Sequence, residues 1–214
     1  SCINRPFYRG GVMVDRTKRQ GRKNRKTSES NVEVFIDLEG RANYTVDTGS
    51  KMLNHLLDQI SRHSGFDLTI KSESSNDPDG HHVAEDTAIV LGRALDEALG
   101  EREGIKRMGH AIVPLDEALA LVAVDLSGRG YSVFDMAFNT PLIGDFRTEL
   151  VSHVLESFAR EGRFNLHVRV LTGANDHHIA EAIFKALAKA LDSAVSLDDR
   201  FFGQSPSTKG TLTE

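Results

Sequence analysis

The sequence has few of the residues that cross-link or anchor a protein. Only one of its 214 residues is a cysteine, Cys2, which excludes an internal disulfide framework and fits a reducing compartment. No apolar run approaches the roughly 18 residues of a membrane-spanning helix, and no apolar stretch with a small-residue cleavage site lies near the start. With 39% hydrophobic and 27% charged residues, we expect a soluble protein that is not secreted, with no membrane partner and a core of its own.

Basic residues gather at the beginning of the chain. Residues 1–26 contain nine Lys or Arg and one acidic residue, although the whole chain carries a net charge of -5. Such an arm can bind nucleic acid, act as a transit peptide or be a disordered tail. No aromatic residue interrupts the basic run from Arg16 to Lys26, as a base-stacking surface would require, and Met13 is a plausible native start. We therefore predict a disordered arm over residues 1–24 in a cytoplasmic protein; a plastid location follows only if the arm is a transit peptide.

Four segments of the chain recur in the same order at a nearly constant offset. Residues 53–57 and 66–68 are echoed 98 positions later, residues 81–85 are echoed 96 positions later, and residues 37–41 are echoed 88 positions later. A repeated order of this kind indicates two copies of one structural unit. We expect a first half over residues 25–110, a second half over residues 111–200 and a tail over residues 201–214.

Each half has the hydrophobic periodicity of strands and helices. Apolar residues alternate from Val32 to Leu38, after Phe66 and after Phe164, as in half-buried strands, and recur at helical spacing from Leu53 to Ile60 and from Val151 to Phe158. The segments 81–99 and 177–195 are amphipathic helices, and residues 118–125 and 131–138 are expected to form a strand pair. The prediction is an α+β fold of duplicated β-β-α-β-α halves, each a two-layer sandwich of sheet and helices.

The repeated segments contain most of the histidines. A helical residue advances by about 100°, so His81 and Glu85 share a face while the adjacent His82 points to another sector, and one motif can serve two sites. The repeat supplies six imidazoles and two carboxylates, which divide into two sets of four. The predicted metal ligands are His55, His81, His82, Glu85, His153, His177, His178 and Glu181.

Four ligands around a six-coordinate ion leave two positions for substrate or water, which is a catalytic arrangement. Nitrogen and oxygen ligands without a thiolate suit manganese, iron, zinc or nickel. A lone paired-histidine motif is more often a surface feature than a metal site, but its exact duplication favours metal binding. The metalloprotease order His-Glu-x-x-His is absent, and Asp86 and Ala182 stand where the inverted motif requires histidine.

Several residues have the chemistry of a phosphate site. The segment Ser205–Gly210 combines hydroxyls, backbone amides and a lysine, although such mixtures near a C-terminus are also typical of disordered tails. Arg107 and Arg129 are further candidates. Lys185 lies four residues after Glu181 and therefore on the same helical face.

These segments resemble the signature segments of the imidazoleglycerol-phosphate dehydratase family. The resemblance rests on 81–86, on 173–186 with its Phe-Lys-Ala continuation, on 125–129 and on 206–210, and extends from about Arg25 to Leu212. It implies a ribosomal-S5-domain-2-like fold in each half and a hydro-lyase of histidine biosynthesis that acts on a phosphorylated imidazole, imidazole glycerol phosphate. It also implies two Mn²⁺ ions per active site, and a homo-oligomer of 24 subunits built from trimers, with sites between subunits.

The resemblance also implies roles for individual residues. The metal ligands fall on the same eight residues that the repeat singles out. Glu29 or Glu181 is the expected base, with His63 assisting, and the alternatives stay open at this point. The implied substrate-contacting residues are Glu29, Gln59, His63, Arg107, Arg129, Lys185, Ser207 and Lys209.

The sequence departs from the family pattern next to one ligand. Asn54 stands where the family usually has aspartate, which removes a carboxylate that could support His55. Two competing hypotheses remain. One is a non-enzymatic oligomer that binds divalent metal for storage or scaffolding, which would need no converging cations. The other is nucleic acid binding through the basic arm, which would not depend on the histidines.

Overall fold

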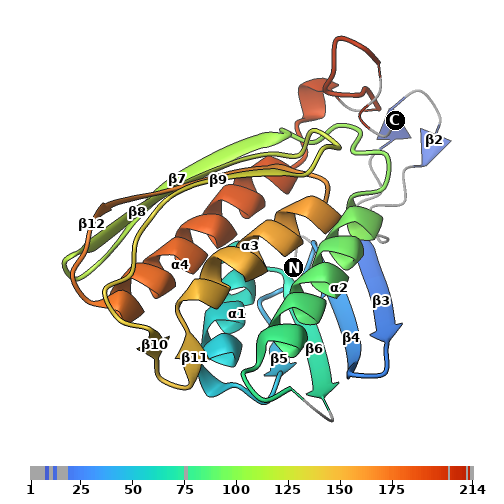
Figure 1. The fold of residues 1–214 in the computed structure, drawn as a ribbon. Coiled ribbons are helices and arrows are strands. Elements are labelled where there is room, and N and C mark those ends of the chain that lie inside the picture. Colours follow the sequence, from blue (N-terminus) through green and yellow to red (C-terminus); the bar gives the residue numbers. More distant parts are fainter. Residues whose placement is uncertain are drawn as a thin grey trace.

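Two four-stranded sheets face each other across four long helices (Figure 1). The computed structural model describes residues 8–9, 12–13, 19–74, 77–201, 203–210 and 212. Most residues of the predicted disordered arm lie outside these ranges. Within it, β1 (Tyr8–Arg9) pairs with β2 (Val12–Met13).

The first sheet and its two helices form the first half of the repeat. Its elements are β3 (Gln20–Lys26), β4 (Ser30–Asp37), β5 (Tyr44–Asp47), α1 (Lys51–Ser64), β6 (Asp67–Ser74) and α2 (His81–Leu99). The strand order is β3-β4-β6-β5, with β5 parallel to β6 and the other pairs antiparallel.

The second half repeats this plan with one small addition. Its elements are β7 (Met108–Leu115), β8 (Ala118–Asp125), β9 (Tyr131–Asp135), the short hairpin β10 (Leu142–Ile143) and β11 (Phe146–Arg147), α3 (Glu149–Glu161), β12 (Asn165–Thr172) and α4 (Asp176–Val195). The strand order β7-β8-β12-β9 matches that of the first sheet. A 3₁₀ turn, Asp199–Phe201, leads into the tail.

The duplicated α+β fold is confirmed, but three details of the prediction are wrong. Each half has an additional edge strand at its start, β3 in the first half and β7 in the second, so the order of its elements is β-β-β-α-β-α. Segments 118–125 and 131–135 are strands that do not pair, because β12 lies between them and binds both. The first sheet begins at Gln20, inside the predicted arm, and the second begins at Met108, before the predicted boundary at residue 111.

The core follows from the alternation of apolar residues. On β4, Val32, Val34 and Ile36 are buried, and on α1 the buried row includes Leu53 and Leu56. Each such side chain contributes about 1.5–3 kcal/mol by leaving water. Because each helix pair covers only one face of its sheet, the helices of the two halves pack against each other, α1 against α4 and α2 against α3 (Figure 1).

Equivalent glycines show how closely the two halves match. A Cβ on Gly21 would lie 1.9 Å from the carbonyl oxygen of Ala94, and a Cβ on Gly109 would lie 2.0 Å from that of Ala190. In both halves the first strand therefore crosses the last helix at a point where only glycine fits. None of the described helices is long and apolar enough to span a membrane.

Candidate metal centre and active site

Two predicted ligands from one half meet a third from the other half. His55 on α1 places Nε2 2.8 Å from Oε2 of Glu181 on α4, and Nε2 of His177 lies 3.1 Å from the same oxygen. Their ligand atoms all lie within 4.8 Å of one another. Among the described residues, no other histidine, cysteine or acidic side chains converge so tightly. We call His55, His177 and Glu181 the first triad.

The equivalent residues of the other helix pair form a looser second triad. His153 on α3 and His81 on α2 have ring centroids 5.2 Å apart, and Nε2 of His81 lies 3.8 Å from Oε2 of Glu85. Arg160 approaches Glu85 at 4.0 Å. Each triad thus combines one helix from each half, because the helices pack crosswise.

The charges around the first triad keep its carboxylate ionised. Burial alone would raise the pKa of Glu181, but hydrogen bonds from Lys185 and His55 outweigh it and lower that pKa to about 2. Nζ of Lys185 lies 2.6 Å from Oε1 of Glu181, one helical turn further along α4. Permanent ionisation suits a metal ligand better than a base that must exchange a proton near neutral pH.

His178, the second histidine of its motif, points away from the first triad toward the β7–β8 turn. Its Nδ1–H donates to Oε2 of Glu117 at 2.8 Å, and its Nε2 lies 3.7 Å from Oδ2 of Asp116. Glu117 also accepts the backbone N–H groups of Asn175 and Ala174. Hydrogen bonds from His178 and from these amides lower the pKa of Glu117 to about 2, and Glu117 in turn raises the pKa of His178.

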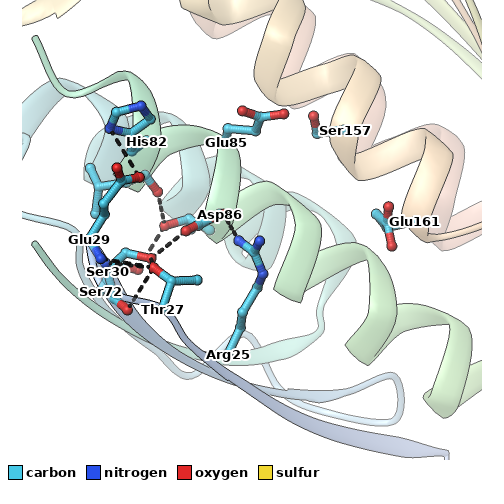
Figure 2. A network of polar contacts seen from close by, with 12 residues as sticks. Arg25, Thr27, Glu29, Ser30, Ser72, His82, Glu85, Asp86, Ser157 and Glu161 are labelled. Atoms are coloured by element: carbon cyan, nitrogen blue, oxygen red, sulfur yellow. Dashed lines mark hydrogen bonds and ion pairs between the residues drawn. The ribbon is translucent and has the colours of Figure 1, made fainter. Parts of the chain in front are cut away.

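His82 lies at the corresponding place in the first half. Its Nδ1 is 3.7 Å from Oε2 of Glu29 in the β3–β4 turn and 3.7 Å from Asp77. Asp77 accepts the backbone N–H groups of His82 and Val83 and so caps α2. Figure 2 shows Glu29 close to His82. Glu29 borders a cavity of about 430 Å³, and its side chain is 55% exposed.

Two rows of polar residues extend from the first triad, one on α1 (His55, Gln59 and His63) and one on α4 (Glu181, Lys185 and Lys189), and the residues of each row are four positions apart. On α1, Nε2 of Gln59 donates to the backbone oxygen of His55. Burial lowers the pKa of His63, and the charges of Lys185 and Lys189 lower it further. Burial and the neighbouring lysine charges therefore favour the neutral form of the His63 imidazole. A cavity of about 580 Å³ opens over the triad itself.

The other predicted phosphate-binding residues lie at the far end of α4. The backbone N–H of Arg107 donates to Ala194, and its guanidinium binds Asp125 and the carbonyl oxygen of Pro206. Ala194 is 13 residues beyond Glu181, a separation of roughly 20 Å along a helix. Ser207 and Lys209 follow Pro206 in the tail, where the backbone N–H of Lys209 donates to Oγ of Ser207. Arg129 lies in the loop after Asp125, and its carbonyl oxygen accepts a hydrogen bond from Asn165. Within one chain, these groups and the first triad do not share a site.

The unusual Asn54 has a local structural role. Its Oδ1 accepts hydrogen bonds from the backbone N–H and the hydroxyl of Thr48, at 2.9 and 2.7 Å. Besides Glu181, the carboxyl group of Asp58 interacts electrostatically with His55; burial raises the pKa of Asp58, and His55 lowers it by a smaller amount.

Sequence reasoning missed Glu117, which orients a predicted ligand. The signal was present, because the offset of 88 residues that relates Asp37 to Asp125 also relates Glu29 to Glu117. Asp77 was missed as well, since its neighbours Asn76 and Asp79 look like ordinary turn residues. The meeting of α1 with α4 could not be read from the offsets, which match segments without placing them in space.

Both triads offer imidazole nitrogens and carboxylate oxygens, which fit a divalent transition metal. Three ligands of one chain converge at the first triad, with open space beside them. The lysine at its edge adds a partner for a negatively charged substrate.

Comparison with known proteins identifies relatives of this chain. A family model described as imidazoleglycerol-phosphate dehydratase matches residues 48–191. A protein of that name from Dehalococcoides mccartyi is 51% identical over 92% of this chain and 98% of its own length, and one from Roseiflexus sp. is 50% identical over 88% and 94%.

Solved structures are similar over the same region. Imidazoleglycerol-phosphate dehydratase from Staphylococcus aureus has a TM-score of 0.75 and 35% identity, covering 84% of this chain and 99% of that one. A structure titled IGPD from Pyrococcus furiosus in complex with (S)-C348 has a TM-score of 0.77 and 34% identity, with coverage of 89% and 100%.

Proposed function

The chain belongs to the imidazoleglycerol-phosphate dehydratase family, and we propose here how its residues perform the family's reaction. The enzyme is a hydro-lyase of histidine biosynthesis that removes water from imidazole glycerol phosphate to give imidazole acetol phosphate. The first triad, with Lys185 beside it, is the observation that carries the proposal. Membership of this family disfavours a protein that only stores metal. Such a protein would need neither Lys185 beside the first triad nor Glu29 beside His82.

The two triads are proposed to hold two Mn²⁺ ions. Each offers two imidazoles and one carboxylate, and Glu181 is already ionised by its neighbours. His82 and His178 supply the fourth ligand of each set. Glu117 binds Nδ1 of His178, so that Nε2, which lies 3.7 Å from Asp116, would be the ligand atom. Bound divalent ions would supply Lewis-acid activation of a substrate oxygen.

Glu29 is the proposed base. The hydrogen to be removed sits on a carbon that no carbonyl acidifies, so the base must be close to it and free to accept a proton. Glu181 is bound by His55, His177 and Lys185 and has a pKa of about 2. Glu29 is more exposed, and its ion-pairing partner among the described residues is the imidazole of His82, at 3.7 Å. His63, whose neutral form is favoured by burial and the neighbouring lysine charges, is proposed to assist in proton movement.

Substrate binding is proposed to combine residues of more than one chain. Lys185 and Gln59 lie beside the first triad, whereas Arg107, Arg129, Ser207 and Lys209 lie near the opposite end of α4. One small phosphorylated substrate cannot reach both groups across roughly 20 Å. His82 and His178 also point away from the triads of their own chain. A shared site brings the far-end residues and these histidines of one chain to the triads of its neighbours.

The outer face of the second sheet supports such an assembly. Met108, Ile112, Tyr131 and Val133 are 63%, 55%, 66% and 40% exposed, and an apolar patch of this kind marks a contact surface. The outer face of the first sheet carries Arg22, Lys71 and Glu73, and its Phe35 is covered by Arg22. We propose a homo-oligomer of 24 subunits assembled from trimers, with the second sheet as a principal contact.

The proposal is tested by dehydration of imidazole glycerol phosphate with metal-stripped protein. We expect no turnover without metal, and formation of the ketone product, followed by its absorbance, when Mn²⁺ is restored. Isothermal titration of Mn²⁺ into the same protein provides a readout besides activity and should give two sites per chain. Unchanged turnover after complete removal of metal would contradict the metal proposal.

A further inference from the structure

A polar layer lies inside the first half, between the β3–β4 turn and helix α2. Asp86 follows the predicted ligand Glu85 and is only 9% exposed. Its carboxylate contacts the guanidinium of Arg25 and the hydroxyl of Ser30, which is itself 4% exposed. Figure 2 shows Asp86 facing the turn, while Glu85 points to the other side of the helix, toward α3.

The layer is connected directly to the turn that carries Glu29. Oγ1 of Thr27 accepts the backbone N–H groups of Glu29 and Ser30, at 3.1 and 2.9 Å. Its hydroxyl lies 3.2 Å from that of Ser30. A hydrogen bond from Ser74 to the carbonyl oxygen of Glu29, at 2.8 Å, holds the turn from the opposite side. The position of the Glu29 backbone is therefore tied to Asp86.

Nearby, a second buried hydrogen bond extends the layer. The hydroxyls of Ser72 and Thr87 lie 2.7 Å apart, and Thr87 also donates to the carbonyl oxygen of Val83 at 2.6 Å. Burying these hydroxyls together with the carboxylate of Asp86, which a partly exposed Arg25 covers, costs desolvation energy that an apolar layer would avoid.

The second half builds the same backbone without these polar groups. The offsets of 88, 96 and 98 residues that relate the halves pair each polar residue with an apolar one, and Gly21 with Gly109 and Ala94 with Ala190 confirm the first two offsets in space. Ala118 and Ala182, the partners of Ser30 and Asp86, are 1% and 0% exposed. The residues equivalent to Arg25, Ser30, Ser72, Asp86 and Thr87 are Val113, Ala118, Val170, Ala182 and Ile183.

The two turns are held in different ways. Glu117, the equivalent of Glu29, is fixed through its own carboxylate by His178 and by the backbone amides of Ala174 and Asn175. A carboxylate bound in this way needs no help from the core. The Glu29 carboxylate has no such cradle among the described contacts, so its turn must be fixed through the backbone for the carboxylate to stay free.

We propose that Asp86 is a positioning residue, which acts with Arg25 and Ser30 to fix the Glu29 turn relative to the predicted metal ligand His82 on α2. The inference rests on the proposed role of Glu29 as base. It assigns the buried polar layer to catalysis rather than to folding, since the other half folds with apolar residues in its place.

The test transfers the apolar layer of the second half into the first. The triple variant Arg25→Val, Ser30→Ala, Asp86→Ala should stay folded, with an unchanged or higher melting temperature and wild-type Mn²⁺ stoichiometry. Its kcat should fall roughly 10–100-fold, the scale of a misplaced catalytic group, while KM changes little. Ser30→Ala alone, which leaves the Arg25–Asp86 pair intact, should show a smaller fall in kcat.

A Glu29→Gln background separates positioning from general damage. If the layer acts through Glu29, the triple substitution should cause no further loss of kcat there, because coupled residues are not additive. Three results would each overturn the inference. The triple substitution could lower kcat equally in the wild-type and Glu29→Gln backgrounds, the triple variant could unfold, or the triple variant could keep the wild-type kcat while Glu29→Gln is inactive. If Glu29→Gln itself keeps full turnover, the base assignment fails first and the inference fails with it.

Discussion

The two halves share a backbone but divide the work of the site. Each presents a His-His-x-x-Glu helix, a third histidine on the preceding helix and a glutamate in the turn between its first two strands. In the second half the turn glutamate, Glu117, is bound to His178, whereas in the first half Glu29 is exposed above a polar layer. We propose that duplication supplied two metal positions and that the turns later diverged, so that one glutamate orients a ligand and the other is free to move a proton.

Removing one ligand from each triad tests whether the halves are equivalent toward metal. His55→Ala and His153→Ala should each lower turnover by more than about 100-fold, beyond the usual effect of losing a residue that only supports a ligand. Each variant should lose one Mn²⁺ per chain in a titration. Lys71→Ala, at an exposed residue on the outer face of the first sheet, is the control and should bind and turn over normally. Retention of both ions by either triad variant would break the proposed equivalence.

Replacing each turn glutamate by glutamine tests the proposed difference between the halves. Glu29→Gln should lower kcat by about 10²–10⁴-fold, the usual contribution of a general base, with Mn²⁺ binding unchanged. Glu117→Gln should instead weaken Mn²⁺ binding by about 10–100-fold, and saturating Mn²⁺ should restore most of kcat. The ¹⁵N shifts of His178 should report loss of its fixed tautomer. The reverse pattern would assign the roles to the opposite halves.

The outer faces of the two sheets differ, and a charge placed on each should separate them. Ile112→Glu puts a carboxylate in the apolar patch of the second sheet and should shift the protein to smaller species in analytical ultracentrifugation, with loss of turnover. Asn24→Glu is the equivalent position on the first sheet, 88 residues earlier, and should leave the particle intact. Equal effects of the two substitutions would remove the distinction between the faces.

A smaller effect is expected where the second half caps a helix of the first. Burial raises the pKa of Asp145, but the backbone N–H groups of Met52 and Lys51 and the hydroxyl of Ser50 outweigh it and lower that pKa. This stabilisation is present above the unfolded pKa and is lost as pH falls through the lower folded pKa. Asp145→Asn should cost roughly 0.5–1 kcal/mol at neutral pH. The difference in melting temperature between Asp145→Asn and the wild type should shrink below about pH 4. A difference that stays constant with pH would contradict a stabilising role of the ionised Asp145 carboxylate.

The duplication was predictable because its strongest signals are local. Paired histidines, alternating strands such as 30–37 and helical rows such as 53–60 lie within single segments, so the offsets revealed both the fold of a half and all eight predicted ligands. Sequence reasoning missed edge strand β5 and paired edge strand β9 with the wrong neighbour, because β6 and β12, to which these strands are hydrogen-bonded, come later in the chain. The meeting of His55 with Glu181 depends on how the halves pack, which no spacing encodes.

The predicted phosphate-binding residues show the same limit. Lys185 was placed beside Glu181 by helical spacing, and the structure has this contact at 2.6 Å. Arg107 and Lys209 were grouped with it by their chemistry alone, yet they lie near the other end of α4. In the proposed oligomer a neighbouring chain brings the two groups together, and a single sequence contains no direct signal of that contact.

Complementation between inactive variants tests the shared site most directly. His55→Ala/His153→Ala disables both triads but keeps His82 and His178, while His82→Ala/His178→Ala keeps both triads. Each variant alone should be inactive. If every metal set combines a triad of one chain with a histidine of another, co-expression of the two should restore a measurable fraction of wild-type turnover in mixed particles. Mixed particles that stay as inactive as either variant alone would contradict the shared site and place each metal set within one chain.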